Sequence, residues 1–420
     1  MSQKLVIFVC INNTVEYLLF LDLMQKPEQQ ELRVYVIDIV PPTFPQDFID
    51  DRMQELESLV TTYKWVVIVK AIQKRSQPDY RTYVWSGKLE EIKADMKANN
   101  AQLLIIWNIM KPGQVFNVSE ILRKEWLQVW DRVDLILKIF ERHATSTEAR
   151  LQIELAAIHH MWPRIFGMGM ELSRQGWWTG WSGGRAGRGI WETNTERMRR
   201  HLKDKKLTIQ KELEKYKKVR WLHRAWRNRK DLFTVGIVWY TNAWKSALMH
   251  SLTWKDILVE NKLFATLWTA VGEMKLPVMI PQNSTSTKGA VAPQERDTNY
   301  TSYGKILVND TIWFIRDLPP DLIEAFTSTL EDSVHAQLLL HVIDASDPKI
   351  SDKIQVVDTI LNHIEAKQQK RYVFNKTDLI TKEQRKKIKE KYKEYNPLFV
   401  SAITGEGIDE LKRYIMSMRP

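Results

Sequence analysis

Arg371-Tyr-Val-Phe374 is a short run typical of a buried strand, and the tetrad Asn375-Lys376-Thr377-Asp378 follows it directly. In parallel α/β sheets, ligands bind beyond the carboxyl ends of the strands, so this tetrad stands where a ligand is expected. A carboxylate at Asp378 can accept two hydrogen bonds, from the ring N–H and the exocyclic amine of guanine. The Asn375 side chain can bond the base edge, and the Lys376 stem can lie against the purine. The pattern therefore indicates recognition of a guanine base.

Two further elements stand in the order that a guanine-nucleotide domain requires. Asp310-Thr311 follows the apolar run Lys305–Val308, where an acid can hold Mg²⁺ through water. Ser401-Ala402-Ile403 follows the run Leu398–Val400, where a backbone N–H can bond the guanine carbonyl. Each element alone is equally typical of a surface turn or a helix cap, but the three in this order favour a guanine-nucleotide domain.

Such a domain needs a phosphate-binding loop after its first strand, with the spacing G-x-x-x-x-G-K-[ST]. The chain has the lysine and the serine but carries tryptophan at both glycine positions, in the sequence Trp239, Tyr240, Thr241, Asn242, Ala243, Trp244, Lys245 and Ser246. Glycine is needed because the backbone wraps the phosphates and adopts torsion angles closed to other residues. An indole at position 244 would occupy the phosphate volume, so the loop as written is not expected to bind a triphosphate normally.

The same replacement recurs in the tetrad expected to read Asp-x-x-Gly, which here is Asp310, Thr311, Ile312 and Trp313. The chain has 17 Trp and 16 Gly, whereas average usage predicts about 29 Gly in this length. We interpret most of these tryptophans as glycine positions, because some bacteria read UGA as glycine and a translation with UGA as tryptophan would give this pattern. The alternative is a tryptophan-rich protein whose nucleotide site has decayed.

The pattern of apolar runs divides the 420 residues into three parts. Residues 1–142 are predicted to form a small α/β domain with a largely parallel sheet. Its strands are expected at 5–10, 32–37, 65–69 and 103–106, and its helices at 45–61 and 89–98. Residues 233–420 return to strand–helix alternation, which predicts an α/β domain with a doubly wound, mostly parallel sheet. A polar segment at 281–303 without periodicity is predicted to be an insertion.

Between these domains, residues 143–232 form a helical, basic segment interrupted by a Gly-rich loop at 176–191, which is not expected to be helical. A helix is expected at 147–160, and a long basic helix or a helical hairpin at 192–230. Residues 197–230 contain 15 Lys and Arg against 3 acidic residues, a net charge of +12 in a chain of net +11. Such a face is either simply solvated or binds a polyanion.

Composition excludes several classes of protein. One cysteine excludes a disulfide scaffold and fits a reducing compartment. No apolar run approaches the length of a membrane span, and the first residues lack a signal-peptide layout. A cytoplasmic protein with no integral-membrane part is therefore expected.

The chain resembles the HflX-type ribosome-associated GTPases over most of its length. The resemblance is carried by segments that include Ser86–Glu91, Asp131–Leu137, Leu151–Ala156, Pro163–Gly167, Tyr240–Ser246, Phe264–Leu267, Asp310–Pro319 and Ala325–Glu331. It implies that tryptophan stands at expected glycine positions at 85, 162, 177, 178, 191, 239, 244 and 313. It also implies an N-terminal α/β domain, a helical segment and a C-terminal P-loop G domain.

The resemblance further implies a role for individual residues. Lys245 would contact the β- and γ-phosphates, and Ser246 and Thr266 would ligate Mg²⁺. The first switch would be the nucleotide-contacting segment Phe264, Ala265, Thr266, Leu267 and Trp268. Phe314 takes the place that many GTPases give to a water-orienting Gln, so slow intrinsic hydrolysis and activation by a partner are expected.

The resemblance implies that the protein binds GTP and GDP and the RNA of the large ribosomal subunit, and that it does not bind DNA. It also implies a protein that splits or rescues stalled or idle ribosomes. The protein is expected to be a monomer. If the tryptophans are real, the chain would instead be a nucleotide-independent RNA- or ribosome-binding scaffold with a decayed G domain. An ATP-driven RNA remodeller is a weaker alternative, because Asp378 favours guanine.

Overall fold

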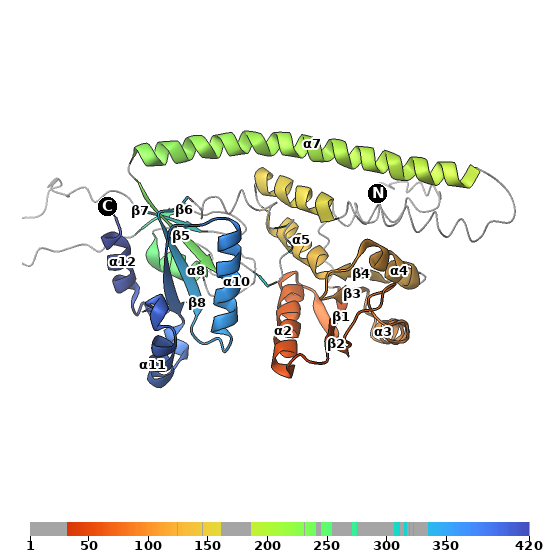
Figure 1. Ribbon diagram of the computed structural model, residues 1–420, viewed down its shortest axis with the longest axis horizontal. Coiled ribbons are helices and arrows are strands. Elements are labelled where there is room, and N and C mark those ends of the chain that lie inside the picture. The colour runs from red at the N-terminus through yellow and green to blue at the C-terminus, as the bar shows by residue number, and fades with distance from the viewer. Residues whose placement is uncertain are drawn as a thin grey trace, which may run out of the picture. The chain divides into compact units, whose positions relative to one another are not determined.

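A computed structural model describes most of the chain, and its described residues form two compact units, one ending at Arg142 and the other running from His143 to the C-terminal end (Figure 1). The described residues are 32–123, 125–144, 146–160, 186–230, 232–240, 245–253, 271–274, 306–310, 315–316, 319, 322 and 335–419. The predicted strand at 5–10 and the predicted insertion at 281–303 lie outside them.

The first unit is an α/β domain in which each strand is followed by a helix. Its elements are β1 (Arg33–Val40), α2 (Gln46–Thr62), β2 (Val66–Lys74), α3 (Ser86–Ala98), β3 (Leu103–Ile106), α4 (Pro112–Arg123), β4 (Gln128–Asp131) and α5 (Arg132–His143). The sheet has the order β2-β1-β3-β4, and all of its strand pairs are parallel. The mixed α/β fold expected for this part of the chain is therefore confirmed, and β4 is a further strand that the sequence did not indicate.

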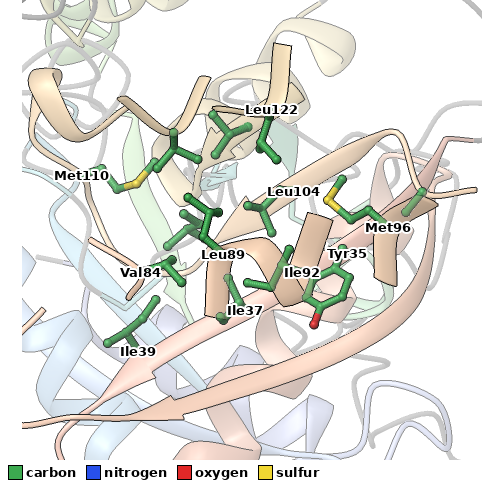
Figure 2. Close-up of a cluster of buried hydrophobic side chains, with 14 residues drawn as sticks. Tyr35, Ile37, Ile39, Val84, Leu89, Ile92, Met96, Leu104, Met110 and Leu122 are labelled. Atoms are coloured by element: carbon green, nitrogen blue, oxygen red, sulfur yellow. The ribbon is translucent and has the colours of Figure 1, made fainter. Parts of the chain in front are cut away.

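One hydrophobic cluster of this unit lies between the sheet and helices α3 and α4 (Figure 2). Strand side chains such as Tyr35, Ile37 and Leu104 meet Leu89 and Leu122 from the two helices, and all five are almost fully buried. Alternate positions of β1 point to the same face, which is why Tyr35, Ile37 and Ile39 belong to this cluster. Burial of these apolar side chains is the main force that holds the sheet and its helices together.

The carboxyl ends of strands β1, β3 and β4 are filled by the protein's own side chains. Trp107, directly after β3, is 3% exposed and lies beneath the guanidinium groups of Arg52 and Arg132, at 4.7 and 4.2 Å from the ring centroid. Arg52 donates to both carboxylate oxygens of Asp38, at 2.7 and 2.9 Å. Arg132 is paired with Glu55 at 2.7 Å. This edge of the first sheet is thus a closed aromatic and ionic cluster.

A tryptophan with a left-handed backbone lies in the turn that follows helix α4. Trp126 has φ 59° and is 89% exposed. Its N–H donates to the carbonyl of Arg123 at 3.0 Å, and the N–H of Leu127 donates to that of Leu122 at 3.3 Å. This pair of bonds is the Schellman arrangement, in which the left-handed residue is usually glycine because a Cβ atom is disfavoured there.

The second unit begins with a helix over residues 147–160 and continues with the 44-residue helix α7 (Ala186–Arg229). The two helices are joined by ion pairs between Lys205 and Glu154 and between Arg220 and Glu148. The expectation that the Gly-rich loop runs to residue 191 is wrong, because residues 186–191 belong to α7. Each added residue of a long helix gains a hydrogen bond, so the helix extends through Gly187 and Gly189 although glycine disfavours it. The rest of that loop, 176–185, lies outside the described residues.

The remainder of this unit is a six-stranded sheet with helices and short 3₁₀ turns between its strands. Its elements are β5 (Phe233–Trp239), α8 (Lys245–Leu252), β6 (Val271–Glu273), β7 (Ile306–Asp310), β8 (Leu338–Asp344), α10 (Ile350–His363), β9 (Gln369–Asn375), η1 (Thr377–Leu379), α11 (Lys382–Lys391), η2 (Lys393–Tyr395), β10 (Leu398–Phe399) and α12 (Ile408–Ser417). The strand order is β10-β9-β8-β5-β7-β6, and only the β6–β7 pair is antiparallel. The predicted doubly wound, mostly parallel sheet is confirmed.

No helix of the described residues is long and apolar enough to cross a membrane.

Candidate functional site

The base-recognition elements predicted from the sequence meet at one edge of the second sheet. Asn375 ends β9 and is paired in register with Asp344, the last residue of the neighbouring strand β8. On the other side, β10 pairs with β9 at Phe399 and Phe374, so Ser401 follows β10 beside the tetrad. Parallel strands end at the same edge, which is why segments 23 or more residues apart in the chain converge here.

Hydrogen bonds hold the two loops in a fixed arrangement. The N–H of Ala402 donates to Oδ1 of Asn375 at 3.0 Å, and Ser401 Oγ donates to Oδ1 of Asp378 at 2.5 Å. Asn375 and Ser401 are buried, at 1% and 0% exposed, whereas Asp378 is exposed. The buried side chains therefore position an exposed carboxylate, which is the group expected to accept hydrogen bonds from guanine. Thr377, buried, donates its N–H to the carbonyl of Val400 at 3.3 Å.

The loop that carries Ser401 closes on two glycines. Gly407 has φ 73°, and a Cβ atom there would lie 2.2 Å from the carbonyl oxygen of Phe399, so a side chain would displace the end of β10. The N–H of Gly405 donates to the carbonyl of Ser401 at 2.9 Å. Ile403, in this loop, is 60% exposed. The backbone around Ser401 thus requires glycine for a physical reason.

The phosphate end of the predicted site is described in part. Trp239 is the last residue of β5, is 3% exposed and is paired in register with Val342 of β8. Tyr240 is buried, and its hydroxyl accepts a hydrogen bond from the N–H of Arg316 at 3.3 Å. Residues Lys245 and Ser246 begin α8, so the amino-terminal end of a helix follows the loop, which is where anions bind.

Asp310 is the last residue of β7 and not, as expected, a residue beyond the strand. It is paired in register with Ile237 of β5, two residues before that strand ends at Trp239. The other predicted nucleotide contacts fall outside the described residues, namely Thr241, Asn242, Ala243, Trp244, Phe264, Ala265, Thr266, Leu267, Trp268, Thr311, Ile312 and Trp313.

A cluster of titratable side chains lies between the same sheet and helix α10. Burial lowers the pKa of His341 on β8 from 6.5 to about 4, with the neighbouring Asp358 opposing and Lys370 adding to this shift. Burial and the carboxylate of Asp358 raise the pKa of Tyr372, whose hydroxyl donates to that carboxylate at 2.9 Å. Lys370 pairs with Asp358 at 2.9 Å. These groups hold α10 against the strands that carry the site.

Two contacts near the site were not anticipated. Lys376 pairs with Asp344 at 2.5 Å, and Tyr240 contacts the segment that follows Asp310 through Arg316. The apolar run Leu338–Ile343 indicates that Asp344 stands at a strand end, but it does not indicate which residue Asp344 pairs with. The second depends on the path of the backbone after Asp310, for which the sequence holds no signal.

A mostly parallel sheet with Asn375, Asp378 and Ser401 at its carboxyl edge, and with Lys245 and Ser246 opening a helix after its first strand, defines a P-loop guanine-nucleotide-binding domain. Three family models match the chain: a GTP-binding GTPase N-terminal domain at residues 50–141, a GTP-binding GTPase middle region at 143–227 and a 50S ribosome-binding GTPase at 234–376.

Similar proteins span most of the chain. GTPase HflX of Caldanaerobacter subterraneus subsp. tengcongensis is 36% identical over 360 residues, which cover 86% of this chain and 76% of the relative. GTPase HflX of Methanocaldococcus jannaschii is 34% identical, with 89% and 83% covered. GTPase HflX of Escherichia coli is 33% identical, with 88% and 79% covered. The chain belongs to the HflX family of GTPases, and it is a GTP hydrolase.

Proposed function

We propose that this protein couples GTP hydrolysis to binding of the large ribosomal subunit and thereby splits or rescues stalled or idle ribosomes. The observation that carries the nucleotide half is the hydrogen-bonded set Asn375, Asp378 and Ser401, which leaves one exposed carboxylate in place for guanine. The ribosomal half is supported by the match of residues 234–376 to a family described as 50S ribosome-binding GTPases. The protein acts as a cytoplasmic monomer with no DNA partner and no integral-membrane part.

In this proposal the reaction is in-line attack of water on the γ-phosphoryl group. Lys245 contacts the β- and γ-phosphates and stabilises the charge that develops there. The hydroxyls of Ser246 and Thr266 would hold Mg²⁺, with Asp310 contributing through water. These are oxygen donors, which Mg²⁺ prefers, and Ser246 and Asp310 lie on elements that end or begin at the same sheet edge. When bound, Mg²⁺ neutralises charge on the β- and γ-phosphate oxygens.

Phe314 stands where many GTPases carry a water-orienting Gln, and its ring cannot polarise water. Hydrolysis by the isolated protein is therefore slow and is accelerated by the ribosome. Single-turnover GTP hydrolysis with and without 50S subunits tests this. Equal rates in the two conditions would contradict ribosomal activation while leaving the GTPase assignment intact.

We propose RNA binding through the exposed basic side of α7. Lys217 and Lys218 are exposed there, in the part of the chain with net charge +12. Reversing both charges to Glu should weaken binding to 50S subunits about tenfold at physiological salt. A helix with fewer cations neutralises fewer RNA phosphates and therefore releases fewer counterions on binding. Lys386 and Lys387, exposed on α11, provide a matched control pair whose reversal should leave the binding unchanged. Co-sedimentation at two salt concentrations measures both effects.

We also propose that Trp239, Trp244 and Trp313 are glycine in the native protein. Two physical features support this: an indole at 244 would fill the phosphate volume, and Trp126 occupies a left-handed, exposed helix end where glycine is usual. Peptide mass spectrometry of the protein from its source cells, across Phe233–Lys245 and across the peptide that contains position 313, tests the proposal. Tryptophan at both 239 and 244 would contradict it and would favour a nucleotide-independent ribosome-binding scaffold.

A further inference from the structure

The backbone of Lys376 adopts a conformation that its residue type disfavours. It has φ 65° and ψ 36°, the left-handed region, and the residue is 8% exposed. A residue with a Cβ atom occupies this region at a cost, and such strain persists where surrounding contacts enforce it. The contacts that enforce it therefore show which groups act on this lysine.

Asp344 forms an ion pair with this lysine. Its Oδ2 lies 2.5 Å from Nζ of Lys376, and the two side chains are 16% and 9% exposed. Its Oδ1 accepts hydrogen bonds from the N–H and the hydroxyl of Ser346, at 2.9 and 2.6 Å. Both carboxylate oxygens thus have partners. The bonds from Ser346 to Oδ1 fix the orientation of the carboxylate, so that Oδ2 faces Lys376.

The two loops are also joined through the backbone. The N–H of Ala345 donates to the carbonyl of Asn375 at 2.9 Å. Asp344 and Asn375 are partners in the β8–β9 register, so the acid and the lysine stand at neighbouring strand ends. The nearby acid Asp347 has its own partner, Lys353, and does not share this role.

We propose that Asp344 is a positioning residue for nucleotide binding, which holds the Lys376 stem extended along the strand ends where the face of the purine lies. The inference rests on the proposed role of Asn375–Asp378 in base recognition. An unpaired lysine has many rotamers, and fixing one before the ligand arrives removes an entropic cost of binding. Asp344 acts through Lys376 and does not itself contact the base.

This role has a signature that distinguishes it from that of Asp378. The stem of Lys376 contacts the ring face, which guanine and hypoxanthine share, whereas Asp378 recognises the exocyclic amine that hypoxanthine lacks. Loss of Asp344 should therefore weaken GDP and IDP equally, by about tenfold. Loss of the Asp378 carboxylate should instead collapse the preference for GDP over IDP.

The test is titration of the full chain, with the residues that mass spectrometry reports at 239, 244 and 313, using fluorescent GDP and IDP. Asp344→Asn should raise both dissociation constants about tenfold with their ratio unchanged, and Asp344→Glu should recover part of the affinity because it retains the charge. Asp358→Asn is the matched control: it breaks a comparable ion pair, with Lys370, at the opposite end of β9 and should leave both constants within twofold.

A double-mutant cycle decides between positioning and general destabilisation. In the Lys376→Met background, Asp344→Asn should have no further effect on the GDP dissociation constant, because the group through which it acts is gone. Additive effects, or a single Asp344→Asn variant that binds GDP as the parent does, would overturn the inference. Should Asp344→Asn lower the melting temperature, the cycle is read from Asp344→Glu in the same two backgrounds.

Failure of the underlying site is a separate result. If Asp378→Asn leaves the GDP-to-IDP ratio unchanged, the base site itself is wrongly assigned. If that ratio collapses while Asp344→Asn has no effect, only the role of Asp344 is wrong.

Discussion

The two sheets of this protein obey the same topological rule and differ in what stands at their carboxyl edges. In the first, Arg52 and Arg132 lie over Trp107 and are paired with Asp38 and Glu55, so the edge is filled by ion-paired side chains around a buried ring. In the second, buried polar groups hold the exposed carboxylate of Asp378 in place. A parallel sheet offers a possible ligand-binding site at the carboxyl ends of its strands. Whether a ligand can bind there depends on whether the polar side chains at that edge are already paired with one another.

The largest expected effect is a loss of stability on disrupting the cluster around Trp107 at the carboxyl edge of the first sheet. Trp107→Ala should lower the free energy of unfolding of the first unit by about 3–5 kcal/mol, because it removes a large buried ring and leaves a cavity beneath two guanidinium groups. Guanine-nucleotide binding by the second unit should be unchanged. Denaturant unfolding and a GDP titration measure the two outcomes.

Trp126→Phe is the control for this variant, since it keeps a Cβ atom and an aromatic ring at an exposed position. It should change stability by less than about 0.5 kcal/mol. A loss of GDP affinity in Trp107→Ala would show that the first edge contributes to nucleotide binding after all.

Disrupting the carboxyl edge of the second sheet should weaken nucleotide binding and leave the free energy of unfolding unchanged. Asp378→Asn should weaken GDP binding about 100-fold, because a site built to pair with a ligand amine is left with a mismatched group. Xanthosine diphosphate, which carries an oxygen in place of that amine, should bind the variant better than GDP does. Competition titration with the two diphosphates decides the matter, and an unchanged order of preference would argue against the assigned role of Asp378.

The second sheet should also be the pH-sensitive one. The pKa of His341 is lowered to about 4 in the folded protein. As the pH falls below 6.5, the unfolded chain therefore binds a proton at this imidazole, whereas the folded chain does not bind one until the pH nears 4. Stability is therefore full above pH 6.5 and is lost as the pH falls toward 4, by about 2–3 kcal/mol. Thermal unfolding of the parent and of His341→Leu between pH 7.5 and 4.5 measures this, and parallel profiles for the two proteins would refute it.

The smallest expected effect is a gain in stability. Trp126→Gly should raise the free energy of unfolding by about 1 kcal/mol, because glycine adopts the left-handed backbone at the end of α4 without the cost of a Cβ atom. Equilibrium unfolding in urea provides the comparison with the parent. A destabilised variant would indicate that the indole packs in solution.

Much of the fold could be predicted because buried strands leave contiguous apolar runs. The runs at 103–106, 338–343 and 371–374 each match a strand within one or two residues at either end. Strand β6, only three residues long, leaves no such signal. The helical start of α7 leaves no sequence signal, because Gly187 and Gly189 disfavour a helix locally, whereas a helix gains stability over its whole length.

The candidate site divides in the same way. Asn375, Asp378 and Ser401 could be found because each directly follows an apolar run. The pairing of Lys376 with Asp344 could not, because it depends on the register between β8 and β9 and on a left-handed backbone at Lys376. The left-handed state of Trp126 depends likewise on local backbone geometry that composition does not encode.

Helix α7 spans about 66 Å at 1.5 Å per residue, roughly three times the helix over 147–160 that it pairs with. Leu202 and Ile209 are buried, whereas Val219, Leu222 and Trp226 are 47%, 56% and 52% exposed. Beyond Arg220, which pairs with Glu148, backbone hydrogen bonds in the exposed part can open with little loss of apolar packing. Amide hydrogens should therefore exchange slowly around 202–209 and quickly around 222–229. The stretch 220–229 carries four of the eight arginines of α7, and it is helical mainly through its own backbone hydrogen bonds.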